Sequence, residues 1–481
     1  MSGIGIEFRR IYKRRNVTAT LHELGHSMIT TITPMLLTML VLFALYATTD
    51  YDSARYADRE LLSLGMTYIF VFSLLVTALF SGPVSHCLSD LLFVSAFDDV
   101  MPTYAAGLAL TMGTAGVLGV AFAAVLVVGG SVSALFAFLQ LFGFLSMSLA
   151  FYNMTFVSAA KGTKRIAIYF LAGMGAAFCL AQLLELVGVE TLCAIFVGMD
   201  VGFLLIAALE YAYLRAAFPG NSGNHTLLKR YLKRDNWVLI SSFLYTLGLF
   251  CHNFVYWFSS LGVTVAQVFR YAPTYDKAAF IGMYTNVMAG VLFVMQVDSH
   301  FADRYRAYAA TVNVGRLQEI RVAQNRMFRM ISHILFSTVK LQFICAVGLY
   351  LLFMVVLPGL GFYGLTMDFY PCLAAGYFAM YVMYGQLMFQ HYLDDRRGAL
   401  ATSLVFLLTT CLGSAAACLW LPYDWQGIGL FAGSVCGWTV SYFRLGWLEK
   451  HYEAFVFCQG QLVKRKSADM PDGCAYRAQR S

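Results

Sequence analysis

Continuous apolar runs of about 20 residues or more recur along the whole chain, separated by short polar or basic stretches. A run of roughly this length crosses the hydrocarbon core of a bilayer as a helix. Inside a bilayer the backbone hydrogen bonds have to be satisfied within the segment itself, and a helix does this. The runs predict an all-α polytopic membrane protein with about twelve transmembrane helices. The predicted spans are 26–48, 63–84, 103–129, 132–156, 166–189, 192–214, 236–259, 275–297, 332–358, 366–389, 399–421 and 426–447.

Composition excludes other classes of protein. Of the 481 residues, 59% are hydrophobic and only 12% are charged, whereas a soluble domain is about a quarter charged. This excludes soluble multidomain proteins and enzymes with a single anchor. A β-barrel would alternate apolar and polar residues in segments of about 10. The apolar runs here are continuous and about twice that length, so a β-barrel is excluded as well. No P-loop occurs, so we expect no ATP hydrolysis by this chain. We also expect no cofactor and no enzymatic activity.

Lysine and arginine are distributed unevenly between the two sides of the predicted membrane. One set of alternate loops and both termini carry 28 of the 33 basic residues. Because basic residues mark cytoplasmic loops, both termini are expected in the cytoplasm. The net charge of +7 is therefore interpreted as a topology signal, not as a site for nucleic acid. Loop 85–102 is the exception, with Asp90, Asp98 and Asp99 and no basic residue.

The spans divide into two halves of similar length, the layout of a six-plus-six transporter. A polar linker, 217–235, separates bundle 26–216 from bundle 236–447. The basic segments 1–25 and 448–481 flank them. In the second half, residues 300–331 combine apolar residues with six arginines. They are expected to form a cytoplasmic amphipathic helix on the inner leaflet, or an ordinary solvated helical loop.

One motif suggests a metal. His22, Glu23 and His26 match H-E-x-x-H, in which two histidines on one helical face hold zinc and the glutamate acts as a base. Intramembrane zinc proteases also need a distant carboxylate ligand on another span, and the sequence has no segment of that type. We therefore interpret the motif as a decoy and expect no bound metal, with a protease as the weaker alternative.

Charges within spans are the candidates for a transport path, because each is costly near the bilayer centre. Asp200 and Lys340 lie near the predicted midplane, and Glu185 is closer to the outer end of its span. A buried structural ion pair between Asp200 and Lys340 is the alternative interpretation. Arg270 and Lys277 flank an outward loop, where they line an exit or cap it. Asp90 adds acidity at the inner side.

Three stretches carry a family resemblance. The opening Ser2-Gly3-Ile4-Gly5-Ile6-Glu7-Phe8-Arg9-Arg10 resembles the G-I-G-F-E-L-R start of the PelG family of exopolysaccharide transporters. Ser81-Gly82-Pro83-Val84 with Asp90 resembles that family's S-G-P-V…D stretch. Val297-Asp298 with Phe301, Tyr305 and Arg306 resembles its acidic-x-x-F-x-x-x-Y-R run, with Asp298 where Glu is usual. The family-motif residues are Gly3, Gly5, Glu7, Arg9, Gly82, Pro83 and Asp298.

The resemblance implies a flippase-like fold with two six-helix bundles around a central cavity, related to multidrug and polysaccharide exporters. It implies export of a cationic, amino-sugar-rich polysaccharide of the Pel type across the inner membrane of a bacterial cell, during synthesis of a biofilm matrix. The implied partners are this polysaccharide, membrane lipids, a cytoplasmic glycosyltransferase and a cyclic-di-GMP-responsive membrane scaffold. A flippase of the same fold for lipid-linked sugars or small molecules is the alternative.

Overall fold

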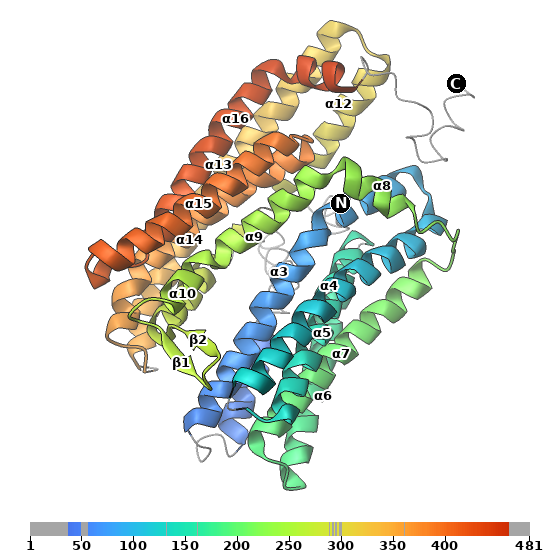
Figure 1. Cartoon of the computed structure of the whole chain (residues 1–481). Helices are drawn as coiled ribbons and strands as arrows, with labels where there is room; N and C mark the ends of the chain where they lie inside the picture. Colours follow the sequence, from blue (N-terminus) through green and yellow to red (C-terminus); the bar gives the residue numbers. More distant parts are fainter. Residues whose placement is uncertain are drawn as a thin grey trace, which may run out of the picture.

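The computed structural model describes residues 37–49, 56–130, 132–160, 162–287, 289–290, 293, 296–297, 301–359 and 361–460. This part of the chain is helical almost throughout, with one short β-hairpin (Figure 1). After a helix over Leu37–Thr48, the elements are α3 (Tyr56–Val94), α4 (Val100–Gly129), α5 (Ala134–Ala159), α6 (Thr163–Leu186), α7 (Thr191–Ala217), α8 (Leu227–Arg234), α9 (Asn236–Trp257), β1 (Val263–Val265), β2 (Phe269–Tyr271), α10 (Pro273–Asn286), α12 (Ala302–Val314), α13 (Leu317–Gly359), α14 (Leu365–Tyr392), α15 (Arg396–Trp420) and α16 (Ile428–Gly460).

Nine helices within the described ranges are long and apolar enough to cross a membrane, so the chain is a multi-pass membrane protein. These are α3 to α7, α9 and α13 to α15. Three other predicted spans, 26–48, 275–297 and 426–447, coincide in part with the helix over Leu37–Thr48, with α10 and with α16. The helical class is confirmed, and the count of twelve spans stays a prediction.

Local sequence explains where helices begin and turn. The short turn at 187–190 joins α6 to α7, and its Gly188 has a φ of +88°. Glycine reaches that left-handed conformation without a steric penalty, which lets the chain reverse within a few residues. At the start of α5, the Ser133 hydroxyl accepts a hydrogen bond from the backbone N–H of Phe136, 3.1 Å away, and so caps the helix.

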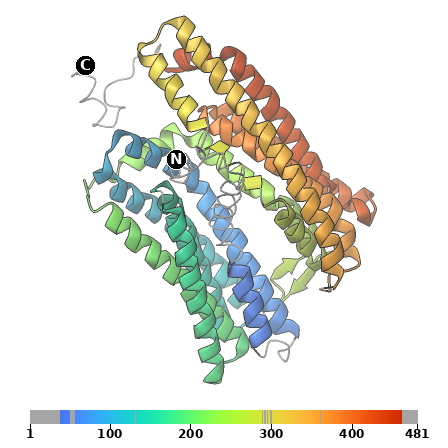
Figure 2. The same cartoon turned by 180° about the vertical axis from the view of Figure 1, so that it is seen from behind.

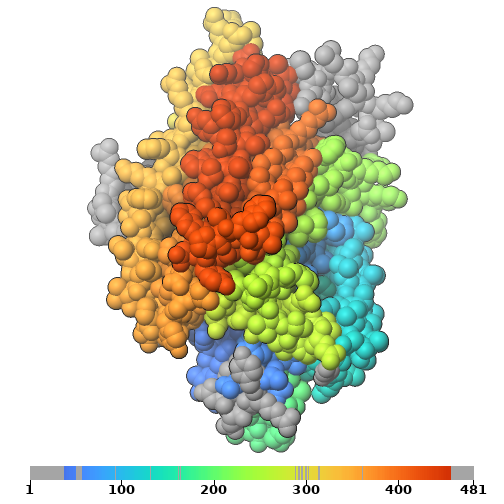
Figure 3. Space-filling model, turned by 60° about the vertical axis from the view of Figure 1, so that its left-hand side comes forward, coloured from blue at the N-terminus to red at the C-terminus, as the bar shows by residue number. Residues whose placement is uncertain are grey.

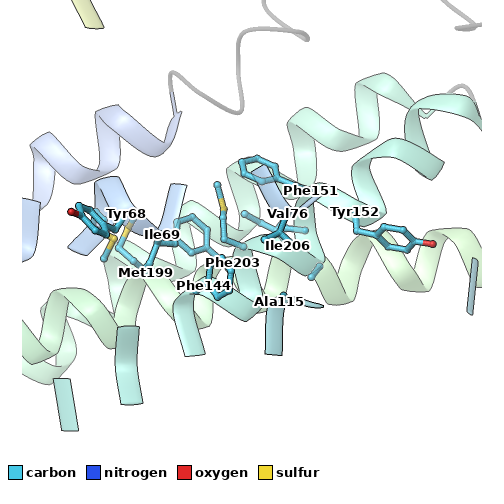
Figure 4. Close-up of a cluster of buried hydrophobic side chains, with 14 of the residues drawn as sticks. Tyr68, Ile69, Val76, Ala115, Phe144, Phe151, Tyr152, Met199, Phe203 and Ile206 are labelled. Carbon is cyan, nitrogen blue, oxygen red and sulfur yellow. The ribbon is translucent and has the colours of Figure 1, made fainter. Parts of the chain in front are cut away.

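The helices form two groups (Figures 1 and 2). Helices α3 to α7 pack on one another, and α9, α10 and α13 to α16 pack on one another. The two groups meet chiefly where α3 lies against α9. Ile69, Phe144, Met199 and Phe203 belong to the apolar core of the first group (Figure 4). That core continues into the second group through residues of α9, α10 and α14.

A separate apolar core holds α12, the start of α13 and the end of α16 together. Tyr308 of α12 and Phe328 of α13 both pack against the ring of Tyr452 on α16. Figure 3 shows this extension, which we call the tip, with α12 and the start of α13 in yellow beside the end of α16 in red.

The tip corrects the expectation of a single amphipathic helix over 300–331. The chain breaks near Gly315 into α12 and α13. Residues 317–331 are the first turns of a 43-residue helix that continues as the predicted span 332–358. The placement of this segment on the inner leaflet stays a prediction, but the structure divides it between two helices.

Candidate functional site

The boundary between the two groups contains a family-motif glycine. Gly82 lies in α3, and a Cβ atom built there would be 2.7 Å from the Ser242 hydroxyl and 3.0 Å from Val238 Cγ1 on α9. Both distances are tighter than ordinary van der Waals contact, so only glycine lets α3 and α9 approach this closely. The next residue, Pro83, is buried and removes one backbone hydrogen bond from α3.

An ion-pair network closes one end of this boundary, and we call it the Asp235 network. Asp235 precedes α9 and its side chain is fully buried. Its carboxylate lies 2.7 Å from His86 Nδ1 on α3, 3.0 Å from Arg234 Nε and 2.7 Å from Arg396 Nη1 at the start of α15. Arg396 also donates to the backbone carbonyl of Arg234 at 2.8 Å. One carboxylate thereby joins α3 to two segments of the second group.

The contacts of Asp235 determine its ionisation. Burial on its own raises the pKa of a carboxyl group. Here the hydrogen bonds from His86 and Arg234, together with their charges, outweigh burial and lower the pKa of Asp235 to about 2. Burial also opposes the charge of Arg234, but its bond to Asp235 keeps the pKa of the guanidinium above its usual value. At neutral pH the network therefore contains a buried carboxylate held by cations.

Two acidic residues of loop 85–102 contact the linker that follows α7. Asp90 accepts a hydrogen bond from the Tyr231 hydroxyl at 2.8 Å and lies 3.5 Å from Arg234 Nη2. The carboxylate of Asp99 accepts a short hydrogen bond from the Ser222 hydroxyl. Loop 85–102 therefore lies against the linker, and Asp90 is paired with Arg234 there.

Contacts across the boundary between the two helix groups also occur at the end of α3 that is predicted to lie outside the cell. The Tyr68 hydroxyl on α3 donates to the carbonyl of Arg270 at 2.9 Å and accepts from its N–H at 3.1 Å. The Tyr68 ring stacks on Trp257 of α9 with centroids 5.1 Å apart. The Arg270 side chain is exposed and lies over the Phe258 ring, and Lys277 is also exposed. These two predicted path residues do not converge with the others.

Asp200 is buried without a partner. Its side chain on α7 is fully buried, and neither carboxylate oxygen has a hydrogen-bond partner among the described residues. A Cβ atom at Gly143 on α5 would lie 2.2 Å from Asp200 Oδ1, so glycine makes room for the carboxylate.

The structure contradicts the alternative interpretation, a buried ion pair of Asp200 with Lys340. Lys340 is exposed on α13, which packs on α12 and α14, whereas α7 packs on α5 and α6. The depth of a residue in a span gives its height in the membrane but not the side of the helix on which it lies.

Other predicted residues have simpler surroundings. Glu185 is half-buried at the end of α6 and accepts a hydrogen bond from the Thr191 hydroxyl at 3.1 Å, across the α6–α7 turn. The N-terminal motif residues, the triad His22, Glu23 and His26, and Asp298 lie outside the described residues. Within the described ranges, no group of three or more His, Cys, Asp or Glu side chains could hold a metal ion.

Sequence reasoning missed the most connected polar residues. Asp235 was not singled out, because it follows a basic run and precedes a span, where an acidic residue looks interfacial. Asp395 forms two bonds to Arg444, at 2.7 and 2.8 Å. Asp276 accepts from Asn253 at 2.7 Å and from the Trp257 indole at 2.9 Å. All these partners are distant in sequence or hidden among other candidates, so the residue pattern alone offers no signal for the pairing.

Comparison with known proteins agrees with this architecture. Residues 1–457 match the PelG family, described as "Putative exopolysaccharide Exporter (EPS-E)". No curated protein matches the chain.

Solved structures share the fold. MATE in the bent conformation is 12% identical with a TM-score of 0.57, over 89% of this chain and 96% of that one. The MATE transporter ClbM in complex with Rb+ is 12% identical with a TM-score of 0.58, over 88% and 94%. A MOP superfamily transporter from Pyrococcus furiosus is 13% identical with a TM-score of 0.56, over 89% and 96%. The fold of the chain is therefore that of the MATE and MOP transporters.

Proposed function

We propose that this chain, which belongs to the PelG family of exopolysaccharide exporters, carries an exopolysaccharide across the bacterial cytoplasmic membrane. The proposed substrate is an amino-sugar-rich, cationic polymer of the Pel type. The proposed machine consists of two six-helix bundles, with the polymer passing between them and both termini in the cytoplasm. The proposed partners are a cytoplasmic glycosyltransferase and a cyclic-di-GMP-responsive membrane scaffold.

The observation that carries this proposal is the α3–α9 boundary. Transporter halves have to move relative to each other, and a boundary that opens needs contacts that can be made and broken. Here the boundary combines close packing at Gly82 with polar contacts at both ends, the Asp235 network at one and Tyr68 with the Arg270 backbone at the other. Ion pairs and hydrogen bonds of this kind suit a boundary that alternates between closed and open.

Asp200 is our first candidate for a residue that senses the transported charge. A buried carboxylate without a partner is costly in a membrane protein, and such residues commonly have a role in transport. Glu185, Asp90, Lys340, Arg270 and Lys277 are weaker candidates, since the first two are already bonded and the last three are exposed.

Secretion of polysaccharide tests the proposal. In cells that lack this chain, extracellular amino-sugar polymer is expected to disappear, and the wild-type chain is expected to restore it only when the glycosyltransferase is present. Pulse-labelled polymer should then accumulate inside cells that have the glycosyltransferase but lack the chain. Unchanged secretion without the chain would refute the proposal.

A flippase for lipid-linked sugars is the second candidate, and one cavity favours it. The cavity has a volume of about 260 Å³ and lies between α3, α4 and α5. Its walls are apolar apart from Tyr68 and Gln140, and the nearby Leu118 and Phe72 are exposed, at 56% and 37%. An apolar cavity at the edge of a membrane protein suits a lipid chain. Accumulation of a lipid-linked sugar in place of free polymer, in cells without the chain, would favour this function.

A further inference from the structure

A stripe of side chains runs along one face of α14. Its members recur at alternating steps of four and three residues, after a first step of seven, which keeps them on one side of a helix. At 1.5 Å per residue the stripe is about 30 Å long, the thickness of the hydrocarbon core. After the first step, successive members are about 5 Å apart along the helix axis, which is comparable to the length of one sugar ring. The α14 stripe consists of Tyr370, Tyr377, Tyr381, Tyr384, Met388 and His391.

The first two residues of the stripe are sealed inside the second helix group. The Tyr370 hydroxyl is 2.9 Å from the Thr285 hydroxyl on α10, and the Tyr370 ring is fully buried. Tyr377 is buried with its hydroxyl 3.5 Å from Nε2 of His252 on α9. Both hydroxyls have partners, as buried tyrosines normally do. These two residues belong to the packing of the core.

The rest of the stripe is different. Tyr381, Tyr384, Met388 and His391 are half-buried on a helix whose neighbouring positions are mostly buried. Neither the Tyr381 nor the Tyr384 hydroxyl makes a hydrogen bond to any described residue, and neither oxygen is among the buried, unbonded atoms. These hydroxyls therefore point into space that water can reach.

Two further tyrosines extend this accessible part of the stripe. Tyr245 on α9 stacks on Tyr384, with ring centroids 5.2 Å apart. Tyr284 on α10 is a neighbour of Tyr381, and its buried hydroxyl has no hydrogen-bond partner among the described residues. Buried tyrosines normally have a bonded hydroxyl, and the Tyr284 hydroxyl has no such partner in the described part of the chain. It lies beside two hydroxyls that water can reach, so the group has unused hydrogen-bonding capacity that a ligand can take up.

Sugar rings fit this surface. The C–H face of a pyranose stacks on an aromatic ring, and its hydroxyls exchange hydrogen bonds with phenols, so a tyrosine serves both parts of the ligand. The four tyrosine side chains are uncharged, which suits the neutral portion of a sugar ring. Rings spaced by about one sugar allow a polymer to advance from one to the next.

We propose that Tyr381 and Tyr384 of the stripe, with Tyr245 and Tyr284 beside them, form a sugar-binding surface that holds pyranose units of the transported polymer. The inference rests on the proposed function and names its binding surface. Tyr381 and Tyr384 bind by ring stacking, and their hydroxyls orient the sugar.

Binding of a defined oligosaccharide tests the surface directly. The probe is a β-linked hexosamine hexasaccharide, titrated against the purified full chain in lipid nanodiscs. We expect saturable binding by the wild type, weakened about tenfold or more in Tyr381→Ala/Tyr384→Ala because two stacking rings are lost. Tyr381→Phe/Tyr384→Phe keeps the rings and should lose much less. Phe378→Ala is the matched control, since Phe378 is a half-buried ring on α14 that contacts Phe343 instead.

Secretion in cells provides the second measurement. The alanine double variant should insert normally yet secrete little polymer, while Phe378→Ala secretes normally. If the alanine variant does not fold, Tyr381→Leu/Tyr384→Leu fills the same space without rings and decides the question. If a folded variant without the two tyrosine rings binds the hexasaccharide with wild-type affinity, or secretes polymer at the wild-type level, the proposed sugar-binding surface is wrong. Unchanged secretion after deletion of the whole chain would instead overturn the proposed function, whatever the stripe binds.

Discussion

His86 Nδ1 lies 2.7 Å from Asp235 Oδ2, so α3 of the first helix group is bonded to the residue that precedes α9 of the second. Asp235 is fully buried, and it also bonds Arg234 and Arg396. Any separation of α3 from α9 at this end has to break the contact between His86 and Asp235. The first two predictions concern this pair.

Asp235→Asn should destabilise the protein by about 2 kcal/mol, because it removes the charge that balances two arginines and a histidine. The cost is below that of a fully buried pair, since these partners are partly exposed. Thermal unfolding in detergent measures it. Asp394→Asn is the control, because Asp394 also bonds Arg396, at 2.8 Å, but its side chain is 52% exposed. Equal losses in both variants would contradict the central role of Asp235.

Acid should weaken the same contact. The pKa of Asp235 is lowered to about 2 in the folded protein, compared with about 4 in an unfolded chain. Its charge therefore contributes stability above pH 4, and that contribution is lost as the pH falls toward 2. The difference in melting temperature between wild type and Asp235→Asn should shrink over this interval. A difference that stays constant down to pH 2 would show that the Asp235 charge is not responsible.

Gly82→Leu should separate α3 from α9, because even a Cβ atom there would be within 3.0 Å of Val238 and closer to Ser242. We expect a loss of about 1 to 3 kcal/mol in stability and lower secretion. In Gly113→Leu on α4, the added Cβ meets nothing within 4 Å, so stability and secretion should persist. Melting curves and secreted polymer are measured for both. Normal behaviour of Gly82→Leu would mean that close approach at this point is dispensable.

Asp200 and Lys340 should behave independently. In a double-mutant cycle with Asp200→Asn and Lys340→Met, we expect a coupling energy below about 0.5 kcal/mol, because the two residues belong to different helix groups. Asp200→Asn should retain stability and reduce secretion, whereas Lys340→Met should leave secretion unchanged. Coupling of about 3 kcal/mol would restore the discarded ion pair.

Membrane orientation is tested by labelling. An impermeant thiol reagent applied to intact cells should label Ser53→Cys, in the loop predicted outside, and should miss Cys458 and Cys474 in the predicted cytoplasmic tail. Permeabilised cells should label all three positions. The opposite pattern in intact cells would invert the topology derived from lysine and arginine.

Helix positions could be predicted from this sequence because membrane spans carry a local signal. Runs such as 103–129 and 399–421 coincide with α4 and α15 within a few residues. The tip could not be predicted, because the start of α13 is polar while its helix is continuous. Polar residues next to a span resemble a loop when only composition is considered.

The candidate site was only partly predictable. Asp200 and Gly82 stand out because a charge within a span and a motif glycine are visible in one sequence. The contact between His86 and Asp235 joins residues 149 positions apart, and such pairing depends on how the helices rotate about their axes. Apolar runs locate the membrane-crossing part of a helix and leave that rotation open.

The continuous helix α13 has a mechanical consequence. Its 43 residues make it about 65 Å long, roughly twice the hydrocarbon thickness. It has no glycine or proline hinge between the tip and the membrane. A small tilt of the second helix group therefore produces a larger displacement at the tip, because the tip lies far along this rigid helix from the membrane. A protein bound to the tip would be displaced each time the second helix group tilts. By opposing that displacement, such a protein would slow the transport cycle.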